Sequence, residues 1–268
     1  MEDISLEDIM IDPARLHFVS LLLAFAIFGS GTSLAIGAQS ADEIPCRPLA
    51  FANNNYVVCN IDLRRQDVQI FWGSAQGKPF GTISRFIHEL DPTDMRRLVL
   101  VMNAGMYEQD LSPVGLLVER GREVTPVNTA QGTGNFYWKP NGIFFISEGQ
   151  AGILETSLYL QRRPQTDYAT QSGPLLVVDG KIESRMLAST VSRNIRNGVG
   201  VRDGGNAVFA ISEDLVSFSD FAKLFRDALS CPNALYFDGV VSDLLVPGLS
   251  RAAHGSTVGP LVAVFSRP

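Results

Sequence analysis

Short apolar runs separated by turn residues recur along the chain from Tyr56 onward, and this pattern is the strongest constraint on the fold. Runs of this length, rich in Val, Ile and Phe and bounded by Gly, Asn or Asp, are typical of β-strands. Turn dipeptides around Gly121, at Asp179-Gly180 and at Gly204-Gly205 predict hairpins. The strands are expected at YVVCNID, DVQIFW, RLVLVMNA, VGLLVE, GIFFIS, PLLVVDG, NAVFAIS, ALYFD and GPLVAVF.

Only two segments have a convincing helical pattern, TISRFIHEL and SFSDFAKLFRDAL. In the second, apolar residues recur at three- and four-residue spacing, and Ser217 with Asp220 forms a variant of the capping box. Cys231-Pro232 ends this helix, and ALYFD follows directly. The chain is therefore predicted to be α+β: a single strand-rich domain with a mixed or antiparallel sheet and few helices, after an N-terminal signal segment.

The N-terminal 40 residues are expected to be a signal peptide, leaving residues 41–268 as one domain. HFVSLLLAFAIF is an apolar core, and the small residues of GSGTSLAIGAQSA provide a cleavage region. The preceding segment is acidic, with Arg15 its single basic residue, so Met10 is an alternative start. An uncleaved membrane anchor is the second interpretation. The protein is thus expected to be exported, periplasmic or secreted, touching a membrane only through an uncleaved N-terminal segment.

Charge and cysteine content limit the possible binding partners, disulfides and metal sites. The net charge of −6 and pI near 5.1 give no basic stripe, which argues against nucleic acid. An exported chain meets oxidising conditions, so a bridge between Cys46 and Cys59 could staple the loop RPLAFANNNYVV. Pairing of Cys231 with either of them stays open. Without a CxxC or Cys/His cluster, neither a metal nor a cofactor is predicted.

Polar residues and glycine meet at strand edges in four stretches, residues 101–115, 171–177, 192–201 and 236–243. Loops at such edges bring functional groups together. Each stretch could also be an ordinary turn or solvated surface. The candidates are Asn103, Gly105, Glu108, Asp110, Ser172, Gly173, Arg193, Arg196, Asp238, Gly239 and Ser242.

Seven short motifs follow one another along the chain: NAGMY at 103–107, PVGL at 113–116, GNF at 134–136, PNG at 140–142, SGP at 172–174, RNGVG at 196–200 and DGVVS at 238–242. Their order resembles the phosphodiester glycosidase family, whose best-known member removes N-acetylglucosamine from sugar phosphodiesters. The resemblance covers the chain from about Cys46 to its end and implies a pocket near Asn103, Gly105, Ser172, Arg196, Asp238, Gly239 and Ser242. One departure is Val240-Val241 after Gly239, where better-known members have a second glycine and small residues, so a different substrate is expected.

The chemistry of cleaving a sugar phosphodiester suggests roles for the main candidates. Asp238 is predicted to be the nucleophile or general base, and Arg196 a bidentate clamp on the leaving phosphate. Asn103 and Ser172 would bond sugar hydroxyls or phosphate oxygens. Gly105 and Gly239 would let the backbone approach the substrate, in a pocket that includes Gly173 and Ser242.

Other residues compete for the site. Glu108 or Asp110 could supply a second carboxylate, His254 could line the pocket, and Trp138 could stack on a sugar ring. A divalent ion beside Asp238 and Asp243 is left open, although the spacing does not demand one.

The expected function is an exported hydrolase that cleaves a glycosyl phosphodiester, in a surface glycan or exopolysaccharide, at its glycosidic bond. The alternative is a non-catalytic envelope protein for glycan binding or polysaccharide assembly. A third interpretation, an ordinary glycosidase, requires two facing carboxylates about 5 to 9 Å apart.

Overall fold

The structure, a computed structural model, describes residues 45–239, 241–249 and 251–268. The predicted leader over residues 1–40 lies outside the described residues. The strands are β1 Cys46–Phe51, β2 Asn54–Asp62, β3 Gln66–Phe71, β4 Leu98–Asn103, β5 Leu117–Glu119, β6 Arg122–Thr125, β7 Gly142–Ser147, β8 Gln150–Glu155, β9 Tyr168–Ser172, β10 Leu175–Val177, β11 Asn197–Asp203, β12 Asn206–Ser212, β13 Asn233–Asp238, β14 Leu244–Leu245 and β15 Leu261–Ser266. The helices are α1 Ile83–Glu89, α2 Pro92–Arg97, η1 Asn135–Tyr137, α3 Thr156–Arg162, α4 Ser184–Ala188, α5 Phe218–Lys223 and η2 Leu224–Ala228.

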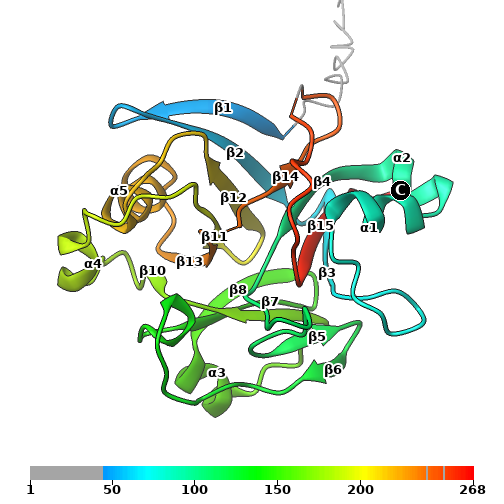
Figure 1. Cartoon of the computed structure of the whole chain (residues 1–268), viewed down its shortest axis with the longest axis horizontal. Coiled ribbons are helices and arrows are strands. Elements are labelled where there is room, and N and C mark those ends of the chain that lie inside the picture. The colour runs from blue at the N-terminus through cyan, green and yellow to red at the C-terminus, as the bar shows by residue number, and fades with distance from the viewer. Residues whose placement is uncertain (1–44, 240, 250) are drawn as a thin grey trace, which may run out of the picture. The chain divides into compact units, whose positions relative to one another are not determined.

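The strands form three sheets, and the paired strands within them are antiparallel (Figure 1). The six-stranded sheet has the order β1-β2-β12-β11-β13-β10, the four-stranded sheet β14-β4-β15-β3, and the five-stranded sheet β6-β5-β9-β7-β8. The predicted α+β, strand-rich class with few helices is confirmed, and the sheets are antiparallel rather than mixed.

The apolar pattern of the strands explains how the sheets are buried. Along β13, Leu235 and Phe237 face a core shared by the three sheets, whereas Ala234 and Tyr236 face a second core under α5. Successive strand side chains point to opposite faces, so a continuous apolar run is buried on both. Phe144 of the five-stranded sheet packs edge-on against Phe237, with ring centroids 6.3 Å apart, and joins two of the sheets.

Helix α5 begins as the sequence predicts. Ser217 and Asp220 form a capping box, in which each side chain bonds the backbone N–H of the other residue. The last turn, η2, is a π-helix, and Phe221 and Phe225 pack edge-on 5.2 Å apart beneath the six-stranded sheet. The other predicted helix is α1, capped by the Thr82 side chain.

Two expectations need correction. The segment between Cys46 and Cys59 is the β1–β2 hairpin rather than a loop. Its Pro48 obscured the strand, yet β1 is an edge strand, where a residue without an N–H is tolerated. The helices α2, α3 and α4 were not predicted, because their apolar residues do not recur at three- and four-residue spacing as Ile83, Phe86 and Ile87 do in α1.

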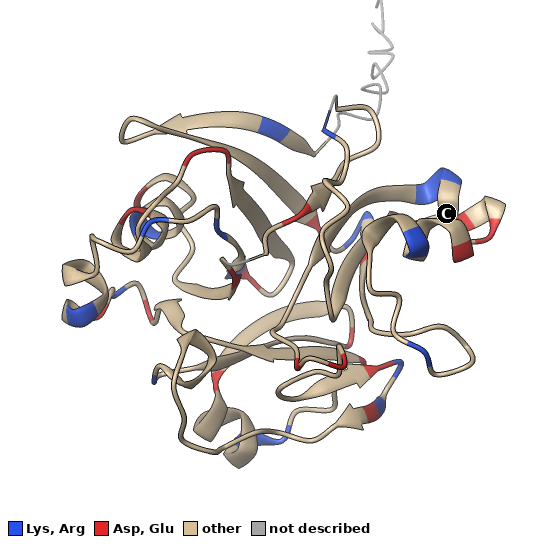
Figure 2. Ribbon diagram, viewed as in Figure 1, with Lys and Arg blue, Asp and Glu red and all other residues tan. Residues whose placement is uncertain are grey.

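Charged residues lie mainly in turns and helices, and those within strands, such as Glu155 and Asp238, lie at or next to the strand ends (Figure 2). This distribution agrees with sheets buried on both faces. Among the described residues, no helix has the length and apolar content needed to cross a membrane.

The predicted disulfide between Cys46 and Cys59 is present, and it joins directly paired residues of β1 and β2. Cys231 is buried and free. The bridge therefore ties the edge strand β1 to its neighbour β2 in the six-stranded sheet.

The double variant Cys46→Ala/Cys59→Ala should lower the free energy of unfolding. The cysteines are 13 residues apart, and closing a loop of about this length in the unfolded chain contributes roughly 3 kcal/mol. Urea unfolding of oxidised wild type and variant measures the difference. A reductant should destabilise wild type but not the variant. Equal unfolding free energies for oxidised wild type and variant would contradict the prediction.

Candidate active site

Two buried asparagines connect the ends of three strands. Asn103 ends β4, and Asn197 begins β11 opposite Asp238 at the end of β13. The Asn197 side-chain Nδ2 donates to the backbone O and to Oδ1 of Asn103, at 2.8 and 2.9 Å. Its Oδ1 accepts from the backbone N of Asp238 at 3.0 Å. This amide pair joins the four-stranded and six-stranded sheets where the candidate residues lie.

The same pair holds the segment that follows β13. Asn103 Nδ2 donates to the backbone O of Val241 at 2.7 Å, and Asn103 Oδ1 accepts from the backbone N of Asp243 at 2.8 Å. Ser242 Oγ lies 3.0 Å from the backbone O of Asp238 and 3.1 Å from that of Ile195. Side-chain bonds thus fix the backbone on both sides of residue 240.

Asp238 is positioned by its own turn. One carboxylate oxygen accepts from the backbone N of Gly239 at 2.6 Å and, at 3.5 Å, from that of Val241. The residue is only 9% exposed. Backbone N–H donors favour the ionised carboxylate and fix its orientation.

Gly239 lies directly above a buried tyrosine. A Cβ placed on Gly239 would stand 1.9 Å from Tyr236 Oη and 3.1 Å from Arg196 Nη1. No side chain fits there without displacing the hydroxyl. Position 239 therefore requires glycine because the Tyr236 hydroxyl and the Arg196 guanidinium pack against its backbone.

Arg196 is fully buried. Its Nε donates to the backbone O of Val216 at 2.9 Å, its Nη2 to that of Ser192 at 2.9 Å, and its Nη1 to Tyr236 Oη at 3.2 Å. The guanidinium carbon stands 3.7 Å from the centre of the Phe218 ring. Two backbone carbonyls thus occupy the Nε–Nη2 edge that a bidentate clamp would use.

Burial controls the titration of this pair. Burial lowers the pKa of Arg196 and raises the pKa of Tyr236 far above its ordinary value. The interaction between the two side chains partly opposes both shifts. Tyr236 is therefore a neutral hydroxyl at physiological pH. No carboxylate forms an ion pair with Arg196 among the described residues. The result is a buried positive charge whose cage consists of carbonyls, a hydroxyl and aromatic rings.

Two further residues border this cluster. Asn135 approaches the cluster from η1, since its side chain offsets part of the rise in the pKa of Tyr236. Tyr107 donates its hydroxyl to the backbone O of Thr257 at 2.8 Å, and burial and the charge of Asp238 raise its pKa. Asn135, Tyr107, Tyr236 and Asn197 were not singled out from the sequence. Three of them lie inside the quoted motifs, and Tyr236 belongs to the apolar run ALYF, which suggested only core packing.

Several predicted residues act as framework around the cluster. Ser172 is fully buried, and its Oγ donates to the backbone O of Phe237 at 2.9 Å. Gly105 donates its N–H to Thr170 Oγ1 at 3.2 Å. A Cβ on Gly173 would meet Asn141 Cβ at 2.7 Å. Their predicted contacts with substrate stay predictions.

The competing residues lie further out. Glu108 and Asp110 are exposed, and Asp110 accepts from the backbone N and hydroxyl of Ser112, which lowers its pKa. The buried carboxylate of Asp243 accepts from the backbone N of His254, whose ring is exposed. Within the described ranges, no group of three His, Cys, Asp or Glu residues could hold a metal ion.

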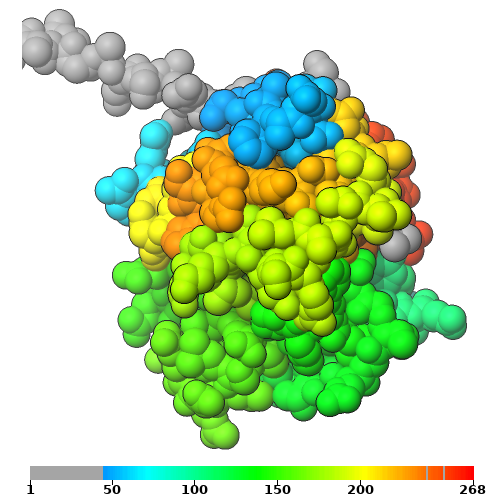
Figure 3. Space-filling view, turned by 90° about the vertical axis from the view of Figure 1, so that its left-hand side faces the viewer, coloured from blue at the N-terminus to red at the C-terminus, as the bar shows by residue number. Residues whose placement is uncertain are grey.

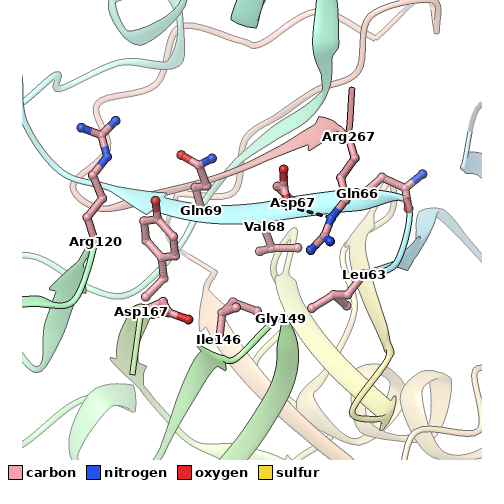
Figure 4. A pocket seen from close by; sticks show the side chains of 11 residues that line it. Leu63, Gln66, Asp67, Val68, Gln69, Arg120, Ile146, Gly149, Asp167 and Arg267 are labelled. Carbon is pink, nitrogen blue, oxygen red and sulfur yellow. Dashed lines mark ion pairs between the residues drawn. The ribbon is translucent and has the colours of Figure 1, made fainter. Parts of the chain in front are cut away.

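A cavity of about 400 Å³ lies beside β3, away from these motifs (Figure 4). Arg267 crosses it to pair with Asp67, with Nε and Oδ1 2.8 Å apart. On its other side, Asp167 accepts from the backbone N of Glu148 at 3.2 Å. None of the quoted motifs contributes to its lining, so it is separate from the candidate site.

Replacing Gly239 with alanine should destabilise the protein by about 1 to 3 kcal/mol, because the methyl group overlaps Tyr236 Oη. Urea unfolding measures this cost. Gly205→Ala is the matched control, since a Cβ there meets only Asp203 Oδ1, at 3.4 Å. Adding Tyr236→Phe to Gly239→Ala should recover part of the loss. If Gly239→Ala unfolds like the control, the close approach is not a constraint.

The sequence profile of the phosphodiester glycosidase family matches residues 96–263. An uncharacterised Escherichia coli (strain K12) protein, YigE, is 31% identical over 222 residues, which are 83% of this chain and 85% of that protein. The zebrafish N-acetylglucosamine-1-phosphodiester alpha-N-acetylglucosaminidase catalytic domain, auto-inhibited by its pro-peptide, has a similar fold. Its TM-score is 0.56 at 14% identity, covering 83% of this chain and 82% of that one. The motif order, the profile match and the Escherichia coli relative together show that this chain belongs to the phosphodiester glycosidase family.

Proposed function

We propose that this protein hydrolyses a glycosyl phosphodiester at the glycosidic bond, with the loop that begins at Asp238 as its catalytic centre. Family membership supports a glycosidase-type hydrolase acting on phosphodiesters. The observation that carries the proposal is the fully buried guanidinium of Arg196 beneath Gly239, the residue that follows the oriented carboxylate of Asp238.

A phosphodiester substrate suits one well-held carboxylate. When the bond from the anomeric carbon to the bridging oxygen breaks, its electron pair stays on that oxygen and a phosphate monoester leaves. The conjugate acid of that leaving group has a pKa of about 6, against about 15.7 for water. The departing group needs little protonation, so the general acid of an ordinary glycosidase is dispensable.

Asp238 is proposed to attack the anomeric carbon or to take a proton from the attacking water. Its bonds from the backbone N–H groups of Gly239 and Val241 hold one oxygen and aim the carboxylate. As nucleophile it would form a glycosyl ester that water then cleaves. As general base it would deliver water directly. Either path ends with free sugar and a phosphate monoester.

Arg196 is proposed to act through its charge and through Tyr236, because backbone carbonyls occupy its bidentate edge. In a low-dielectric interior, a fixed positive charge stabilises nearby developing negative charge more strongly than in water. An anionic phosphate above Gly239 would lie over this charge. Tyr236, kept neutral by burial, holds Nη1 in place.

Export to the periplasm or the cell exterior is part of the proposal, as is a surface glycan substrate. The Cys46–Cys59 disulfide supports export, since such bridges persist mainly in oxidising compartments. A non-catalytic glycan-binding role is the outcome to distinguish from hydrolysis.

Asp238→Asn should lower kcat/KM on an N-acetylglucosamine-1-phosphodiester by roughly 10²- to 10⁴-fold, the usual contribution of a positioned acid or base. Chromatography of free sugar, phosphate monoester and sugar 1-phosphate measures it. Asp227→Asn, an exposed carboxylate paired with Arg226, is the matched control and should keep full activity. Formation of sugar 1-phosphate would overturn the proposed bond. Binding of the diester without turnover would favour the glycan-binding role.

A further inference from the structure

A second cavity, of about 590 Å³, lies between the 129–139 segment and α4. Its volume falls within the range of small-molecule sites. Two aromatic side chains, Tyr137 and Trp138, and two cationic ones, Lys139 and Arg185, line it together with Gly132 and Gly134. We call it the 137–185 groove. Figure 3 views the face of the molecule on which α4 lies.

Arg185 is held in a defined orientation in this groove. Its guanidinium carbon stands 5.6 Å from the centre of the Trp138 ring, and its Nη2 donates to the backbone O of Lys139 at 2.6 Å. Its Nε pairs with Glu183 Oε1 at 3.0 Å. Stacking on an aromatic ring and a carbonyl bond fix a guanidinium in advance, so less side-chain entropy is lost when a ligand binds.

Lys139 adds a second positive charge. Its Nζ donates to Asn141 Oδ1 at 3.1 Å, and an ammonium has three donors. The carboxylate of Glu183 offsets the charge of Arg185, so the charge of Lys139 leaves the groove positive, although the whole chain has a net charge of −6. The groove therefore offers an anion a positive charge between aromatic walls.

The groove is linked to the proposed catalytic loop through packed aromatic rings. Trp138 lines the groove and packs edge-on against Phe218, with ring centroids 5.3 Å apart, and Phe218 packs edge-on against Tyr236 at 4.8 Å. Tyr236 Oη in turn lies below Gly239. A substrate longer than one glycosyl phosphate could therefore contact both the loop and the groove.

We infer that the 137–185 groove binds a second phosphate of the substrate, beyond the phosphodiester that is cleaved. Lysine and arginine are the usual phosphate-binding side chains, and two of them here face one cavity. This inference rests on the proposed function. It names the substrate class as a glycan or glycosyl conjugate with at least two phosphates.

The test compares two diesters on the full-length protein. One joins N-acetylglucosamine 1-phosphate to glycerol, and the other carries an additional phosphate on the glycerol. The wild-type KM should be about 10-fold lower for the second, the scale of one charge-assisted hydrogen bond. Lys139→Gln and Arg185→Gln should each reduce this preference, and Lys139→Arg should retain it. Lys78→Gln, an exposed lysine in another loop, is the control. Equal KM values in wild type, or a preference unchanged in both glutamine variants, would overturn the inference.

Calorimetric titration with inorganic pyrophosphate separates this inference from the proposed hydrolysis. Wild-type protein should bind pyrophosphate, and Lys139→Gln and Arg185→Gln should weaken binding about 10-fold each. Weakened binding in the variants without hydrolysis of either diester would support the groove as a phosphate site and contradict the proposed reaction. Hydrolysis with equal pyrophosphate binding in wild type and variants would support the reaction and contradict the groove.

Discussion

The side-chain amide of Asn197 is the interaction on which the candidate site depends. It is fully buried, and it bonds the end of β4 through Asn103 and the end of β13 through the backbone of Asp238. A buried amide left without partners costs about 1 to 3 kcal/mol for each group, so this arrangement specifies one relative placement of the two strand ends. The position of the Asp238 carboxylate is thus set from the sheets rather than from its loop alone.

The short motifs that mark the family form one connected set of contacts. Asn141 of PNG donates to the backbone of Phe136 in GNF, and Gly173 of SGP packs on Asn141. Ser172 of SGP donates to the backbone O of Phe237, and Arg196 of RNGVG donates to Tyr236, above which Gly239 of DGVVS lies. Most of these residues build the site rather than face it. Motifs that are separate along the sequence, each at the edge of a strand, thus lie together in one cluster of contacts.

Most strands were predictable because a short apolar run bounded by turn residues is a local property, as in β12, β13 and β15. The strands β8 and β9, which have fewer apolar residues, were not predicted. Nor was β1, because Pro48 is tolerated only through its edge position, which depends on the whole sheet. At the site, Asp238 and Gly239 stood out as departures from an apolar run. The burial of Arg196 could not be foreseen, since the carbonyls of Ser192 and Val216 and the ring of Phe218 that enclose it come from different segments.

The bond that breaks in the phosphodiester distinguishes a glycosidase from a phosphodiesterase. Cleavage at the anomeric carbon and cleavage of the phosphorus–oxygen bond on the sugar side give the same products, and only the destination of the water oxygen differs. Hydrolysis in H₂¹⁸O, followed by ³¹P NMR of the phosphate monoester, separates the two. Attack at the anomeric carbon, with Asp238 as nucleophile or base, predicts a phosphate monoester without ¹⁸O. A monoester that carries ¹⁸O would mean attack at phosphorus and would contradict cleavage of the glycosidic bond.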